Sequence, residues 1–120
     1  MSELYLYDNN FNGMIPSETG AMAYPPVLDV SDNLLTGTNL PEFESLQQLS
    51  GLYLEFNKFT GTIPSELGNL KKLTILFLND NRFTGIFPIN IENDLNLEEL
   101  CLKINNFTFT GNLPEINCTD

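Results

Sequence analysis

The sequence lacks most of the residues and motifs on which catalysis and metal binding depend. It has no histidine, and its two cysteines, Cys101 and Cys118, provide neither a disulfide framework nor a zinc-ligand set. It contains no GxGxxG segment, no P-loop and no kinase signature. We therefore expect no enzymatic activity, no cofactor and no metal site.

Positive charge is also scarce. Five Lys and Arg residues stand against sixteen Asp and Glu residues, and the formal net charge is −11. Phosphate binding relies on Lys and Arg, so this balance disfavours nucleic acid and anionic membrane surfaces as partners. The acidity favours solubility and can steer a basic partner toward the protein.

Long apolar runs are absent as well. The longest, at residues 73–78, is interrupted by Thr74 and falls far short of the roughly 20 apolar residues of a membrane helix. The first residues, Met1 to Leu4, lack the basic segment of a secretory signal peptide. We expect one domain with no direct membrane insertion in this segment and no signal peptide.

What the sequence does contain is a repeat of 24 residues. Each unit carries two apolar residues separated by one position, at Leu4/Leu6, Leu28/Val30, Leu52/Leu54, Leu76/Leu78 and Leu100/Leu102. An asparagine follows each pair at a fixed offset, at Asn9, Asn33, Asn57, Asn81 and Asn105. Self-similarity at such a period predicts a solenoid, in which each unit buries its apolar residues against its neighbours.

The pattern resembles the plant-type leucine-rich repeat, LxxLxLxxNxLxGxIPxxLxxLxx, over essentially the whole chain. The third unit reads LSGLYLEFNKFTGTIPSELGNLKK from Leu49 to Lys72. The resemblance implies an α/β solenoid over residues 1–120, a right-handed superhelix with a short parallel concave sheet and a mostly irregular or 3-10 convex side. About five repeats are expected, near 1–24, 25–48, 49–72, 73–96 and 97–120. Because complete caps are not visible, we expect a fragment of a longer protein.

The recurring residue types have mechanical roles. The apolar pairs predict short strands that stack in parallel about 4.8 Å apart, with alternate residues pointing inward. Leu67, Leu70 and Leu73 continue the core along the convex side. In the family that the chain resembles, the asparagines form a ladder that hydrogen-bonds the backbone of adjacent turns. Glycine permits a tight turn, and proline fixes φ on the return path.

Residues that point outward from the strands line the concave face, where this fold usually binds ligands. The ligand-binding candidates are Tyr5, Asp29, Tyr53 and Phe77 in a first column and Tyr7, Ser31, Glu55, Asn79 and Lys103 in a second. Exposed aromatic residues in a row suit contact with a peptide or a carbohydrate. The alternative is that columns of β-forming residues only stabilise the sheet.

A third column, at the strand exits, contains Asp8, Asp32, Phe56, Asp80 and Ile104. Carboxylates on adjacent strands would lie about 5 Å apart, which permits a glycosidase-like pair. However, the acids repeat with the fold, and no sequence resembles a calcium-binding loop. We therefore interpret them as a solvated face.

Two sequons make Asn106 and Asn117 candidate N-glycosylation sites if the chain is secreted, although such triplets also arise by chance. Cys101 is expected to face solvent on the concave side, whereas Cys118 aligns with a core position. Because these positions lie on opposite walls, we expect no disulfide between them.

The resemblance implies a ligand-recognition module of an extracellular or cell-surface, receptor-like protein. Such a module would bind a protein, a peptide or a cell-wall glycan through its concave face, by rigid display of side chains. The alternative is a structural or surface-binding repeat protein, such as an ice-binding one, without a signalling role.

Overall fold

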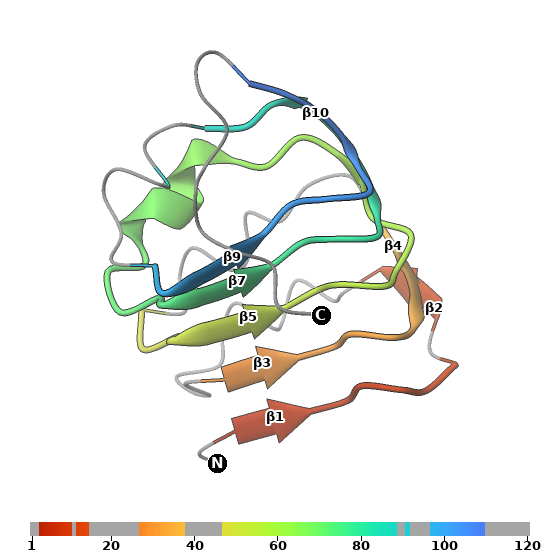
Figure 1. Ribbon diagram of the computed structural model, residues 1–120. Coiled ribbons are helices and arrows are strands. Elements are labelled where there is room, and N and C mark those ends of the chain that lie inside the picture. Colours follow the sequence, from red (N-terminus) through yellow and green to blue (C-terminus); the bar gives the residue numbers. More distant parts are fainter. Residues whose placement is uncertain are drawn as a thin grey trace.

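The computed structural model describes residues 3–10, 12–14, 27–37, 47–88, 91 and 97–109. Its main feature is a parallel sheet of five short strands, which Figure 1 shows stacked one above another in sequence order. The strands are β1 (Glu3–Tyr5), β3 (Val27–Asp29), β5 (Gly51–Tyr53), β7 (Ile75–Phe77) and β9 (Glu99–Cys101). The expected solenoid with a parallel sheet is confirmed.

The strands pair with a register of one repeat. Leu28 lies opposite Leu52, Leu52 opposite Leu76, and Leu76 opposite Leu100. Backbone hydrogen bonds continue past the strand ends, as where the Asp32 N–H donates to the Glu55 carbonyl at 3.0 Å. Residues that are 24 positions apart therefore form straight columns across the sheet.

Each strand exit turns on a residue with positive φ. The residue before the ladder asparagine has φ between 55° and 58° in all five units, at Asp8, Asp32, Phe56, Asp80 and Ile104. This left-handed conformation breaks the extended backbone. The following asparagine is thereby turned away from the sheet face and toward the backbone of its neighbours.

A second set of parallel strands follows the ladder. Strands β2 (Asn12–Met14) and β4 (Leu34–Thr36) form one pair, and β6 (Thr60–Gly61), β8 (Arg82–Ile86) and β10 (Asn106–Thr108) form a three-stranded sheet. The sequence predicts only turns in these segments. Gly85 shows why glycine is needed in β8, since its φ is +83° and an added Cβ would lie 2.7 Å from Thr62 Cγ2.

The convex side carries a short 3-10 helix, η3 (Ser65–Asn69), directly after Pro64. Its turns are closed by bonds such as the one from the Leu70 N–H to the Leu67 carbonyl at 3.1 Å. Leu67, Leu70 and Leu73 have no exposed surface, so the helix faces the core as expected.

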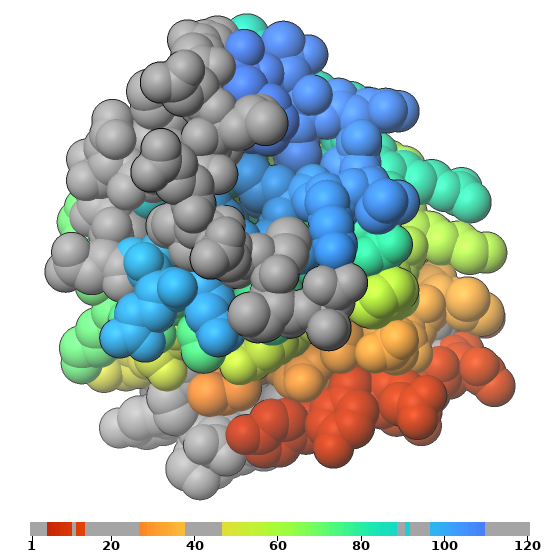
Figure 2. Space-filling view, viewed as in Figure 1, coloured from red at the N-terminus to blue at the C-terminus, as the bar shows by residue number. Residues whose placement is uncertain are grey.

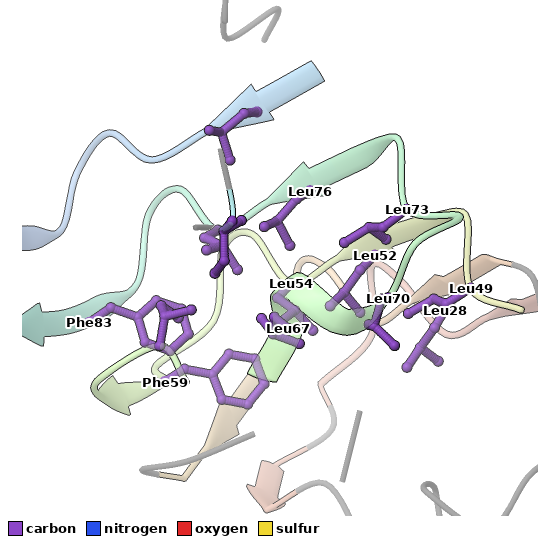
Figure 3. Close-up of a cluster of buried hydrophobic side chains, with 14 of the residues drawn as sticks. Leu28, Leu49, Leu52, Leu54, Phe59, Leu67, Leu70, Leu73, Leu76 and Phe83 are labelled. Atoms are coloured by element: carbon purple, nitrogen blue, oxygen red, sulfur yellow. The ribbon is translucent and has the colours of Figure 1, made fainter. Parts of the chain in front are cut away.

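The core is a continuous stack of leucines and phenylalanines between the sheet and the convex side (Figure 3). Phe59 and Phe83 stack with ring centroids 6.0 Å apart, and Phe83 and Phe107 repeat the same spacing. Each repeat thus packs on the next, and the space-filling view shows the repeats as successive coloured layers (Figure 2). No repeat buries its apolar side chains alone.

Candidate functional site: the concave face

The register brings the nine predicted ligand-binding residues onto one face of the five-stranded sheet. In the first column Asp29 lies opposite Tyr53, and Tyr53 opposite Phe77. Their exposure differs along the column. Tyr5 on β1 is 51% exposed, whereas Asp29, Tyr53 and Phe77 are half-buried. The concave face is therefore most open beside β1 and more tightly packed around β5 and β7.

Two of the second-column residues are not accessible. Ser31 is 5% exposed and Asn79 is 4% exposed. The Ser31 hydroxyl donates to Asp29 Oδ1 at 2.6 Å, and Asn79 Nδ2 donates to Asp80 Oδ2 at 2.7 Å. Both side chains therefore orient a neighbouring carboxylate on this face instead of presenting their own polar atoms to solvent.

Aromatic residues meet edge to face in two places. The ring centroids of Tyr53 and Phe77 are 5.2 Å apart with an interplanar angle of 86°, and those of Tyr5 and Tyr7 are 6.1 Å apart. Tyr7 is 52% exposed, like Tyr5. The β1 pair is open to solvent, while the central pair is held between neighbouring strands.

Two exposed apolar residues were absent from the predicted ligand-binding set. Phe56 is 46% exposed and Ile104 is 65% exposed, both at the positive-φ strand exits. The other units have aspartate at this place, and aspartate tolerates the left-handed conformation better than a bulky or β-branched residue does. The signal in the sequence was the departure of these two residues from an otherwise acidic column.

Glu55 has the most unusual environment on this face. Burial, together with the negative charges of Asp29, Asp32 and Asp80, raises the pKa of its carboxyl from 4.5 to about 7, against a backbone hydrogen bond at Glu55 that lowers it. Glu55 Oε1 is buried and has no hydrogen-bond partner within the described residues. Burial likewise raises the pKa of Asp32, together with the charges of Asp8 and Asp29. Glu55 is thus a carboxyl that is about half protonated near pH 7, in a strongly acidic surface.

No metal site emerges from these acids. Among the residues that the structure describes, no group of three or more His, Cys, Asp or Glu side chains is placed to hold a metal ion.

The asparagine side chains form a ladder behind the face. Asn81 Nδ2 donates to the carbonyls of Leu54, Leu78 and Asn79 at 2.8 to 3.3 Å, and Asn81 Oδ1 accepts from the Phe59 N–H at 3.1 Å. Asn33, Asn57 and Asn105 bond the preceding repeat in the same way. Asn9 bonds its own turn, at Leu6 and Tyr7. The ladder fixes the strand exits of adjacent repeats relative to one another.

The expectations for Cys101 were wrong. Cys101 is 3% exposed and disulfide-bonded, although the alternation of the strand places it in the first column of the concave face. The only other cysteine of the sequence, Cys118, lies outside the described residues. Strand periodicity predicts the direction of a side chain, but it carries no information about what covers that side chain.

Of the two sequons, the one at Asn106 lies within the described residues. Asn106 is an exposed residue of β10, two positions before the exposed Thr108, whereas Asn117 lies outside the described residues. No helix in the described part of the chain has the length and hydropathy needed to cross a membrane.

The sequence profile of the Leucine Rich Repeat family matches residues 1–22, 27–46, 48–70 and 72–93. The chain belongs to the leucine-rich-repeat family. No curated protein matches it.

Several solved structures resemble this leucine-rich-repeat domain. The plant peptide hormone receptor RGFR1, in complex with RGF2, is 37% identical, with a TM-score of 0.80 over 95% of this chain. PEPR1–AtPEP1 is 38% identical, with a TM-score of 0.79 over 85%. The Arabidopsis receptor kinase HAESA, in complex with the peptide hormone IDA and the co-receptor SERK1, is 31% identical, with a TM-score of 0.78 over 95%. This chain spans only 18%, 14% and 19% of those chains, respectively.

Proposed function

We propose that this leucine-rich-repeat domain is an extracellular or cell-surface binding module, not a catalyst, and that its concave face recognises a peptide or an extended protein segment. The observation that carries this proposal is the exposure of four large apolar side chains along the concave face and its strand exits. They are Tyr5, Tyr7, Phe56 and Ile104.

The backbone at two of these residues strengthens the argument. Phe56 and Ile104 occupy positive-φ positions, at 57° and 56°, where a non-glycine residue costs about 1 to 3 kcal/mol. Neither side chain recovers that cost by burial, since both stay exposed. A bound partner that covers them supplies the missing apolar contact, and the fixed sheet limits the entropy lost on binding.

The similar structures support a peptide as the ligand class. RGFR1 is a plant peptide hormone receptor in complex with RGF2, and HAESA is in complex with the peptide hormone IDA and the co-receptor SERK1. Both share this fold over 95% of the chain. The disulfide at Cys101 supports an extracellular location, because disulfides persist in oxidising compartments.

The test is selection from a random short-peptide display library against the immobilised full chain, with a glycan array in parallel. The double variant Phe56→Asp/Ile104→Asp carries the residue that three repeats already have at this place, so the fold is retained. We expect it to weaken the selected peptides by about tenfold or more. The control Ile86→Asn removes an equally exposed apolar residue from β8 and should leave binding unchanged.

Selection of glycans but no peptides would contradict the peptide assignment, and equal binding by the double variant would contradict the assigned surface.

We also propose Asn106 as an N-glycan acceptor. Expression through a secretory pathway should yield an Asn106→Gln variant that lacks the glycan mass of the parent protein.

A further inference from the structure

The concave face combines rings and carboxylates around its central strands. We define the acidic–aromatic cluster as Asp29, Tyr53, Glu55, Phe77 and Glu99. Building on the proposed peptide-binding function, we propose that this cluster takes a cationic side chain of the ligand, the guanidinium or ammonium group of an Arg or Lys.

The register places two kinds of group that attract a cation, carboxylates and aromatic rings, on neighbouring strands. The parallel register sets Asp29 and Phe77 on either side of Tyr53, each one strand away. Burial raises the pKa of the Tyr53 hydroxyl, and so do the negative charges of Glu99, Asp29 and Glu55 around it. A cation there would meet carboxylates and the quadrupole of an aromatic ring together, and each attracts it.

No lysine or arginine of the chain lies at the centre of this cluster to balance its negative charge. Lys71 donates to the Gly68 carbonyl and Lys72 to Gln48 Oε1, both on the convex side. Lys58 and Arg82 each follow a ladder asparagine, Lys58 just before β6 and Arg82 as the first residue of β8. Of the five basic residues in the sequence, only Lys103 occupies an outward concave position, on the far side of β7 from Glu55.

Glu55 makes the proposal specific for a cation over a neutral donor. Its Oε1 atom is buried and has no hydrogen-bond partner in the part of the chain that the structure describes, and the charges of Asp29 and Asp32 from the β3 repeat and of Asp80 from the β7 repeat act on this carboxyl. Ionising Glu55 in these surroundings is less favourable than in water, because its pKa is raised to about 7. A ligand cation beside it lowers its pKa, so binding near pH 7 releases a proton.

The experiment uses the peptides selected on the full chain, each made also with its Arg replaced by citrulline or its Lys by acetyl-lysine. We expect the neutral analogues to bind about tenfold more weakly. Calorimetry in buffers of different ionisation enthalpy should show proton release near pH 7. Glu55→Gln should abolish that release and weaken binding, whereas Glu66→Gln, which removes the same charge from the exposed surface of η3, should change neither.

The outcomes separate the two proposals. Selected peptides that bind equally well after neutralisation, or proton release that persists in Glu55→Gln, would overturn the cation assignment and leave peptide recognition standing. The selection of no peptide at all would overturn the proposed function, and the cation assignment with it. The Gln substitution keeps the shape of the side chain, and its fold can be checked by the circular dichroism of the variant.

Discussion

At the scale of single residues, the positive-φ position before each ladder asparagine is the feature that most separates one repeat from another. Ile104 is the extreme case, because a β-branched side chain suffers most in the left-handed region. Its side chain is 65% exposed, so packing offsets little of the strain. Ile104 should therefore be retained for contact with a partner and not for stability.

Replacing Ile104 with asparagine tests this strain. Asparagine tolerates the left-handed region, so Ile104→Asn should raise the free energy of unfolding by about 0.5 to 1 kcal/mol. The matched control is Ile86→Asn, which removes a 58% exposed isoleucine from β8, a strand in which isoleucine is favoured. Urea denaturation of both variants measures the difference. If Ile104→Asn is no more stable than Ile86→Asn, the backbone at Ile104 does not carry the expected strain.

Glu55 predicts an unusual pH dependence of stability. Its pKa is about 7 in the folded chain and near 4.5 when unfolded, so between these values the native state binds more protons. Stability should then fall as pH rises from about 4.5 to 7 and level off above, by on the order of 1 kcal/mol once partial exposure and solvent screening are allowed for. Thermal unfolding of the parent and of Glu55→Gln across this range measures the effect.

In Glu55→Gln the slope should be reduced, although Asp32, whose pKa is also raised, contributes in the same direction. Glu66→Gln provides the reference for loss of one exposed charge. Stability that rises through this pH window in the parent, or an unchanged slope in Glu55→Gln, would contradict the assigned environment.

Strand alternation could predict which residues point outward, but not which of them are accessible. Ser31 and Asn79 point outward in the pattern and are nevertheless buried, and each donates to the carboxylate of a neighbour. Cys101 was misjudged as well, since it is buried and disulfide-bonded although it points outward in the pattern. Contacts between columns are tertiary facts that a repeat pattern does not contain.

At the scale of elements, the five-stranded sheet was predictable because the apolar pairs recur every 24 residues and a register of one repeat follows. The second set of strands was not. Strand β6 has two residues, Thr60 and Gly61, which is too short for alternation to be visible. Strands of this kind form because the main sheet already holds adjacent repeats in parallel, so the backbone that follows each ladder asparagine pairs with its neighbour.

Among the elements, we expect loss of an asparagine of the ladder to lower the free energy of unfolding the most. Asn81 is buried and makes four hydrogen bonds to the backbone of its own and the preceding repeat. Asn81→Ala leaves those backbone groups unpaired in the interior and should cost about 2 to 4 kcal/mol. Asn9→Ala, at an exposed asparagine that bonds its own turn, should cost about 1 kcal/mol or less. Equal losses in chemical denaturation would show that burial does not set the value of the ladder bonds.

At the scale of the whole molecule, the repeat pattern predicts the solenoid architecture but does not identify the ligand. Each unit buries its leucines against its neighbours in the same way, so each of the five units indicates a solenoid independently of the others. The proposed recognition uses positions where the units differ, such as Phe56 among aspartates, and the repeat pattern does not predict those positions. Family membership therefore establishes the repeat architecture, and the proposed binding function rests on the surface chemistry of this chain.

In the same architecture, cooperative unfolding depends on the packing of each repeat against its neighbours. Leu52 is fully buried in β5, between β3 and β7, and Leu52→Ala should lower the free energy of unfolding by about 3 kcal/mol. If the repeats fold as one unit, the urea midpoint falls and the m-value stays constant. Leu34→Ala, at a 41% exposed position, makes the same chemical change on the surface and should cost about 0.5 kcal/mol or less. A reduced m-value or a second transition in Leu52→Ala would instead mean that the stack separates at β5, because each repeat is held only by its nearest neighbours.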